Sequence, residues 1–159
     1  MNILILCTGN SCRSILAEAT INHLAPPSIR AISAGSKPTG YVHPRSLALL
    51  QREGISVDGL HSKSWENLPV TPDIVITVCG SAAGETCPAY LGPVLRGHWG
   101  VEDPAHATGT DAEIDAAFMT AYRILRTRIE AFLALPLETL QQDRQRLKAE
   151  LDRIGTLQP

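Results

Sequence analysis

A short segment near the start of the chain has the composition of an anion-binding loop. It consists of Cys7-Thr8-Gly9-Asn10-Ser11-Cys12-Arg13-Ser14, placed directly between an apolar run and a helical pattern. A loop in that position offers backbone N–H groups and the positive end of a helix dipole to a tetrahedral oxyanion. Arg13 can add a permanently charged, two-point contact. We therefore predict that residues 8–14 bind an oxyanion and refer to residues 7–14 as the anion loop.

The same local field acts on Cys7, the first residue of the anion loop. A thiol pKa lowered from about 8.5 to about 5.5 makes nearly all of the thiol a thiolate at neutral pH, which corresponds to about 4 kcal/mol. We expect the dipole, the loop N–H groups and Arg13 to achieve this together. Cys7 is thus the predicted nucleophile.

Three further groups could take part in the chemistry. Cys79 ends a β-branched run, Cys87 lies in the segment that follows, and Asp103 precedes a proline in a later loop. Four cysteines are too few for a secreted disulfide framework, so the thiols are catalytic, metal-binding or simply buried. A zinc site is disfavoured because the spacings lack the usual close pairs of ligands. The five histidines show no ligand spacing either, and we predict no metal.

Alternating strand and helix patterns would position these groups. We predict strands at residues 3–6, 30–33 and 73–78, helices at 14–24, 44–54 and 111–135, a loop at 80–93 and one charged helix beyond Pro136. Such alternation favours an α/β domain with a mostly parallel sheet. In such sheets the sites lie at the carboxyl ends of the strands, where the anion loop and Cys79 are expected.

Composition limits the classes of function. The 159 residues suit one domain, with 44% hydrophobic and 19% charged residues and a formal net charge of −2. This charge gives no general attraction for nucleic acid or an anionic membrane. The amino terminus has no basic segment and no long apolar run, and no stretch approaches the length of a membrane span. We expect a cytoplasmic protein without nucleic-acid or membrane partners.

The spacing Cys-x5-Arg-Ser after an amino-terminal strand resembles the low-molecular-weight protein tyrosine phosphatase superfamily. The resemblance implies a three-layer sandwich with a central mostly parallel sheet over residues 1–135, and the charged helical pattern beyond Pro136 predicts a C-terminal helical extension at 136–159. It also implies that Asp103 is the general acid. In phosphatases the Asp-Pro dipeptide is usually followed by tyrosines, whereas Ala105-His106-Ala107 follow it here, which weakens the phosphotyrosine hypothesis.

The chain is similar to thioredoxin-coupled arsenate reductases in four segments: the segment ending at Cys79, then Cys87-Pro88, His98-Trp99-Gly100 and Asp103-Pro104-Ala105. The resemblance implies that Cys7 forms an adduct with arsenate, that Cys79 attacks Cys7 to release arsenite, and that Cys87 then attacks Cys79. Thioredoxin, or glutaredoxin with glutathione, would reduce the last disulfide, and phosphate or sulfate would bind as analogues of arsenate. No cofactor is expected.

In some of these reductases a potassium ion orders the anion loop. Asn10, Glu18 and Ser33 match three of its positions, but the fourth is Ser64 instead of an aspartate. Without that carboxylate a hard cation is attracted less, so we expect weak or absent potassium dependence. Asn10 is expected to support the loop through hydrogen bonds.

Two alternatives remain open. A phosphatase acting on phosphotyrosine or small phosphoesters would use Cys7, Arg13 and Asp103 but would not need Cys79 and Cys87. A thiol-based sensor or metal-binding protein would bind its ligand without turnover.

Overall fold

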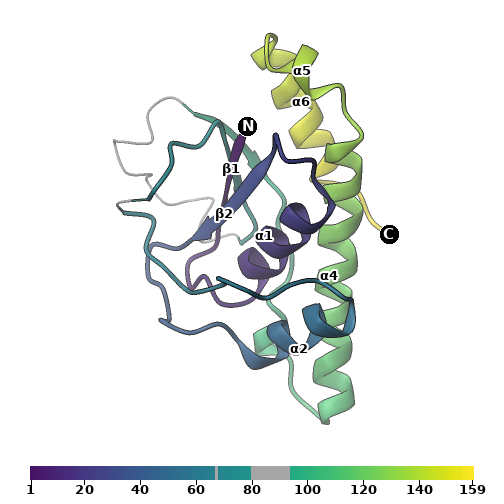
Figure 1. Ribbon diagram of the computed structural model, residues 1–159. Coiled ribbons are helices and arrows are strands. Elements are labelled where there is room, and N and C mark those ends of the chain that lie inside the picture. Colours follow the sequence, from purple (N-terminus) through teal and green to yellow (C-terminus); the bar gives the residue numbers. More distant parts are fainter. Residues whose placement is uncertain (67, 80–93) are drawn as a thin grey trace.

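The computed structural model describes residues 1–66, 68–79 and 94–159 (Figure 1). Its elements are β1 (Asn2–Leu6), α1 (Arg13–Leu24), β2 (Arg30–Ala34), α2 (Pro44–Arg52), β3 (Ile74–Thr77), β4 (Leu95–His98), the 3-10 helix η2 (Pro104–His106), α4 (Asp111–Leu133), α5 (Leu137–Leu140) and α6 (Arg144–Ile154). The loop predicted at 80–93 and Cys87 lie outside the described residues. No helix within the described ranges is long and apolar enough to cross a membrane.

The four strands form one parallel sheet in the order β2-β1-β3-β4. β1 is central because Ile3 to Leu6 are apolar and at most 1% exposed, as a strand covered on both faces requires. Leu6 pairs with Ala34 of β2 and Thr77 of β3, so these strands end side by side. The predicted parallel α/β fold and its C-terminal helical segment are confirmed.

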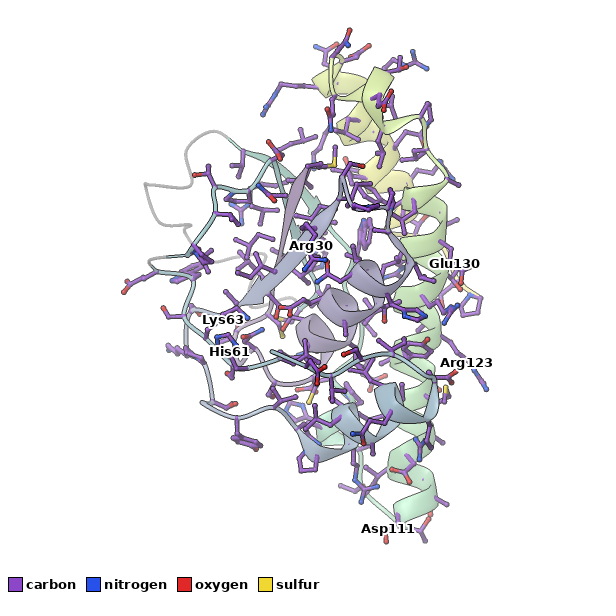
Figure 2. All side chains as sticks on the ribbon, in the orientation of Figure 1. Arg30, His61, Lys63, Asp111, Arg123 and Glu130 are labelled. Carbon is purple, nitrogen blue, oxygen red and sulfur yellow. The ribbon has the colours of Figure 1, made fainter. Side chains whose placement is uncertain are left out.

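Helix α4 runs along α1, with α2 near its first turns and α6 towards its other end (Figure 1). It begins at a capping box, in which Thr110 accepts from the Glu113 N–H at 3.2 Å and Glu113 accepts from the Thr110 N–H at 3.3 Å. A stripe at helical spacing is buried against the core: Phe118, Tyr122, Leu125, Ile129 and Phe132. The charged Asp111, Arg123 and Glu130 lie on the exposed side of the helix (Figure 2).

The secondary structure differs from the prediction in two places. Strand β4 was not predicted, because its sequence Leu-Arg-Gly-His lacks an apolar or β-branched run. The single helix predicted beyond Pro136 is two helices, because Asp143 caps a new start by accepting from the Arg146 N–H at 3.2 Å. Helix α6 buries Leu151 against β4, so its apolar side packs within the chain.

Side chains bind the outward backbone groups of both outer strands. On β2, the Asn22 carboxamide accepts from the Ala31 N–H at 2.8 Å and donates to the Ala31 carbonyl at 3.0 Å. On β4, the Lys148 ammonium donates to the Arg96 carbonyl at 2.6 Å.

Candidate active site

The anion loop connects the end of β1 to the first turn of α1, at the carboxyl edge of the sheet. The Cys7 N–H donates to the Ala34 carbonyl at 3.2 Å, which extends the β1–β2 pairing by one residue. A Cβ on Gly35, the residue after Ala34, would lie 2.3 Å from the Thr8 carbonyl oxygen. The loop therefore lies directly against a glycine that has no room for a side chain.

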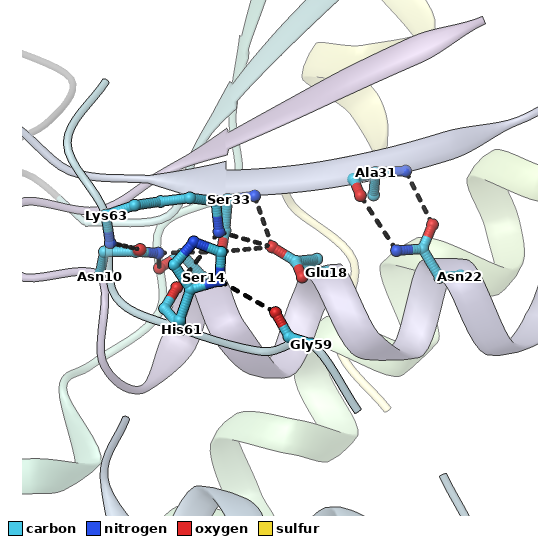
Figure 3. A network of polar contacts seen from close by, with 9 residues as sticks. All are labelled: Asn10, Ser14, Glu18, Asn22, Ala31, Ser33, Gly59, His61 and Lys63. Atoms are coloured by element: carbon cyan, nitrogen blue, oxygen red, sulfur yellow. Dashed lines mark hydrogen bonds and ion pairs between the residues drawn. The ribbon is translucent and has the colours of Figure 1, made fainter. Parts of the chain in front are cut away.

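Asn10 fixes the path of the loop (Figure 3). It is fully buried and adopts a left-handed conformation with φ of 46°, which asparagine tolerates better than most residues. Its side-chain N–H groups donate to the hydroxyls of Ser14 and Ser33, each at 2.9 Å, and its carbonyl accepts from the Lys63 N–H at 2.8 Å. The prediction that Asn10 supports the loop through hydrogen bonds is confirmed.

The network continues to Glu18, a buried carboxylate of α1 (Figure 3). Its Oε1 accepts from the Ser33 N–H at 2.6 Å and the Ser33 hydroxyl at 2.7 Å, and lies 3.4 Å from the Lys63 ammonium. Ser64, the fourth position of the suggested potassium site, accepts from the Glu66 N–H at 3.1 Å. These residues do not fit a metal cation, because the Lys63 ammonium already lies on the carboxylate that would attract one.

Arg13 connects the anion loop to the loop that follows β4. Its NH1 donates to the Val101 carbonyl at 2.8 Å, and its NH2 lies 3.4 Å from the Asp103 carboxylate. The Nε of the same guanidinium is buried and has no hydrogen-bond partner among the described residues. A buried donor without a partner is costly, so this N–H is suited to a bound oxyanion.

Asp103 lies beside Arg13 and precedes η2. Its carboxylate accepts from the Ala105 N–H at 2.9 Å and lies 3.5 Å from Nε2 of the exposed His106. A cavity of about 260 Å³ adjoins Asp103 and is lined on its other side by α4. The predicted nucleophile and arginine, both in the anion loop, thus meet the predicted acid, in the loop after β4, at one edge of the sheet.

Cys79 follows β3 and lies directly against the anion loop. It is 5% exposed, and its sulfur accepts from the Thr8 N–H at 3.4 Å. Its thiol is also hydrogen-bonded to that of Cys7. The structure therefore brings Cys7, Arg13, Cys79 and Asp103 together, while Cys87 lies outside the described residues.

The expected lowering of the Cys7 pKa is wrong for this arrangement. The hydrogen bond to Cys79 and burial raise the pKa of the Cys7 thiol well above its ordinary value, while Arg13 and the Gly9 N–H act in the lowering direction. The sequence argument counted only the loop and Arg13, and nothing in the spacing of residues 7 and 79 reveals that their thiols touch. In this state Cys7 holds its proton.

Other residues of the site were not predicted. Lys63 contributes both its backbone N–H and its ammonium to the network around Asn10 and Glu18. Cys12, which the predicted anion loop already includes, is buried, and burial raises the pKa of its thiol. His43 caps α2, and its backbone N–H donates to the Ser11 carbonyl at 3.1 Å.

The amino-acid sequence of this chain is similar to those of known proteins. Residues 2–146 match the family model described as low molecular weight phosphotyrosine protein phosphatase. The chain is 37% identical over 131 residues to an arsenate reductase of Halalkalibacterium halodurans, a match that covers 82% of this chain and 93% of the relative. An arsenate reductase of Bacillus subtilis is 34% identical with the same coverage.

Solved structures agree with the sequence comparison. A structure described as an arsenate reductase in the phosphate binding state aligns with a TM-score of 0.69 and 29% identity, covering 84% of this chain and 96% of the other. A thioredoxin-dependent arsenate reductase of Corynebacterium glutamicum aligns with a TM-score of 0.54 and 27% identity, covering 81% of this chain and 61% of the other.

Proposed function

This chain belongs to the low molecular weight phosphotyrosine protein phosphatase family, and we propose that its reaction is the reduction of arsenate to arsenite through three thiols. The hydrogen bond between the thiols of Cys7 and Cys79 is the observation that carries the proposal. Ester hydrolysis needs one nucleophile, whereas reduction needs a second thiol that can reach the first sulfur. The curated relatives named above are arsenate reductases.

In the first step the oxyanion binds in the anion loop and Cys7 attacks arsenic. The free Nε of Arg13 and the loop N–H groups bind the arsenate oxygens. A sulfur–arsenic bond forms while the Cys7 proton passes through the Asp103 carboxylate to an arsenate hydroxyl, which leaves as water as its bond to arsenic breaks. Arsenic remains pentavalent in the Cys7 adduct.

In the second step Cys79 gives its proton to an arsenic-bound oxygen and attacks the sulfur of Cys7. A Cys7–Cys79 disulfide forms, the sulfur–arsenic bond breaks, and its electron pair stays on arsenic, which leaves as trivalent arsenite. Two thiols are thereby oxidised and one arsenic is reduced, so the electrons balance. The contact between the two thiols supports this step, because a disulfide requires the sulfurs to approach to about 2.05 Å.

In the third step Cys87 attacks Cys79, which restores Cys7 and leaves a Cys79–Cys87 disulfide. An external dithiol reduces that disulfide by thiol exchange. We propose thioredoxin as this partner, with glutaredoxin and glutathione as the competing possibility. The alignment with a thioredoxin-dependent reductase supports the first choice.

The test measures arsenite formation by the wild type, Cys7→Ser, Cys79→Ser and Cys87→Ser, once with thioredoxin and its reductase and once with glutaredoxin and glutathione. We expect all three variants to lose steady-state turnover. Cys87→Ser is expected to release about one arsenite per enzyme, because the first two steps do not use that thiol. Normal turnover by Cys79→Ser would exclude the three-thiol mechanism.

Hydrolysis of an aryl phosphate by the same variants tests the alternative function. A phosphatase would lose activity in Cys7→Ser and keep it in Cys79→Ser, because its mechanism needs only the first thiol. Rapid hydrolysis without arsenite formation by the wild type would assign the site to phosphate esters.

A further inference from the structure

Arg128, on α4, is a buried cation that the proposed reaction does not use. It is 3% exposed, and no ion pair of Arg128 occurs in the part of the chain that the structure describes. Burial lowers its pKa from the ordinary arginine value. Burying a charge without an opposite charge is costly, so the hydrogen bonds of the guanidinium must offset that cost.

Those hydrogen bonds join two segments that are far apart in the sequence. The Nε of Arg128 donates to the Leu157 carbonyl at 3.1 Å, and its NH1 donates to the Gly100 carbonyl at 3.1 Å. Leu157 follows α6, and Gly100 lies in the segment between β4 and Asp103. Arg128 therefore connects the C-terminal segment to the loop that carries the proposed acid.

The two arginines bind neighbouring peptide carbonyls of that loop. Arg128 binds the Gly100 carbonyl, and Arg13 of the anion loop binds the next one, that of Val101. The intervening backbone is held to the end of β3 as well, since the Val101 N–H donates to the Val78 carbonyl at 3.1 Å. Asp103 comes two residues after Val101, so its position depends on these contacts.

Helix α6 adds direct contacts to the same loop. The indole N–H of the buried Trp99 donates to the Leu151 carbonyl at 3.0 Å. A Cβ on Gly97 would lie 3.1 Å from Cβ of Leu151, and one on Gly155 would lie 2.4 Å from the His98 carbonyl oxygen. Packing this close leaves α6 and residues 97–100 little freedom to move relative to each other.

We propose that residues 144–157 position the proposed acid Asp103, with Arg128 as the positioning residue that transmits this constraint. The inference rests on the proposed function, because it concerns the residue that donates the proton when water leaves. The C-terminal helical segment, which the sequence predicts as an extension of the domain, thereby helps to hold a residue that the proposed reaction requires. Arg128 touches neither Asp103 nor the anion loop in any contact described above.

The test compares Arg128→Met and Arg128→Lys with Arg126→Met. Arg126 is a matched control on the same helix, since it pairs with Glu130 and Tyr122 and makes no hydrogen bond to the loop. Removing a hydrogen bond to a charged group typically costs about 1.5–3 kcal/mol, which corresponds to about a 10- to 100-fold change. We expect kcat for arsenate to fall by about that factor in Arg128→Met, less in Arg128→Lys and not in Arg126→Met.

A second readout separates positioning from binding and from general stability. Among the described residues Arg128 has no hydrogen bond or ion pair with the anion loop, so phosphate should protect Cys7 from iodoacetamide at the same concentrations in Arg128→Met and the wild type. Hydrogen exchange should become faster in residues 99–103 of this variant and stay unchanged in residues 8–14. Arg128→Lys, which keeps the charge, provides the same comparison if Arg128→Met does not fold.

A wild-type kcat in Arg128→Met would overturn the proposal, and so would unchanged exchange in residues 99–103. A parallel fall of kcat and phosphate protection would also overturn it, because it indicates a general loss of structure. If the wild-type protein forms no arsenite, the proposed function fails, while the exchange experiment still decides whether Arg128 couples the two segments.

Discussion

The thiol of Cys79 is hydrogen-bonded to that of Cys7 at the base of the anion loop. Cys79 also accepts the Thr8 N–H, so its sulfur is held at the start of the loop that binds the oxyanion. The contact has two consequences. It places an attacking sulfur next to the sulfur that it must oxidise, and it stabilises the protonated form of Cys7 until an anion arrives.

Cys79→Ala is therefore expected to lower the pKa of Cys7, because the largest cause of its raised value is removed. A decrease of one pKa unit increases the thiolate fraction about tenfold below the pKa. Alkylation of Cys7 by iodoacetamide at pH 7, followed by peptide mass spectrometry, should be about tenfold faster or more. Cys12→Ala is the control and should leave the rate unchanged. An equal or slower rate in Cys79→Ala would contradict the role assigned to the contact.

Stability should fall with pH above the ordinary thiol pKa. The hydrogen bond to Cys79 and burial raise the pKa of Cys7 well above its ordinary value, so the folded protein keeps a proton that the unfolded chain loses near pH 9. The stabilisation is complete below about pH 9 and declines above it by about 1.4 kcal/mol per pH unit for one such thiol. Urea unfolding from pH 8 to 10.5 should show a steeper decline for the wild type than for Cys7→Ser. Parallel curves would count against a raised pKa.

Lys63→Met should destabilise the fold through Glu18. Both side chains are at most 16% exposed, and the variant leaves a buried carboxylate without its cation. We expect a loss of about 1–3 kcal/mol in the free energy of unfolding, and most of it should return in Lys63→Arg. Arg153→Met is the control, because the exposed ion pair of Arg153 with Glu150 should contribute less than about 1 kcal/mol. Equal losses in the two methionine variants would contradict this assignment.

Arsenate reduction should proceed equally fast in potassium chloride and sodium chloride at the same ionic strength. The Lys63 ammonium already supplies a positive charge at the Glu18 carboxylate. The measurement is the steady-state rate across a titration of each salt. A rate that saturates with potassium and does not respond to sodium would show that a specific cation site exists.

Gly35→Ala should disturb both the fold and the anion loop. The new Cβ would lie 2.3 Å from the Thr8 carbonyl oxygen and 2.5 Å from that of Cys7, so the backbone must move. We expect a loss of about 1–3 kcal/mol and weaker phosphate binding, measured by urea unfolding and calorimetry. Gly54→Ala is the control, since nothing lies within 4 Å of its Cβ position and only the positive φ of 73° is unfavourable. A variant with wild-type phosphate affinity would contradict this prediction.

Local patterns were sufficient to predict the anion loop and its place at the end of β1. Cys7, Arg13 and Ser14 lie within one strand-loop-helix unit, and both the apolar run and the helical spacing are visible in the sequence. The capping box at Thr110 is equally local, because its two partners are three residues apart.

Features that depend on distant residues could not be predicted in this way. Strand β4 forms at the sheet edge although its sequence has little preference for a strand, because β3 pairs with it and α6 packs against it. The raised pKa of Cys7 comes from a residue 72 positions away, and the cation at Glu18 comes from Lys63. The burial and the charged neighbours of Cys7 and Glu18 follow from tertiary packing, and the spacing of residues along the chain does not predict that packing.

The contacts of the Asn22 and Lys148 side chains with the outer strands affect whether the sheet can pair with another molecule. An open sheet normally offers unpaired peptide groups at its margins to a strand from another molecule, which is how many proteins aggregate. Here the Asn22 carboxamide imitates the peptide of a neighbouring strand at Ala31, and Lys148 occupies the Arg96 carbonyl on the opposite margin. A foreign strand would have to displace these groups before it could add, so the fold protects itself against edgewise polymerisation with side chains of its own helices.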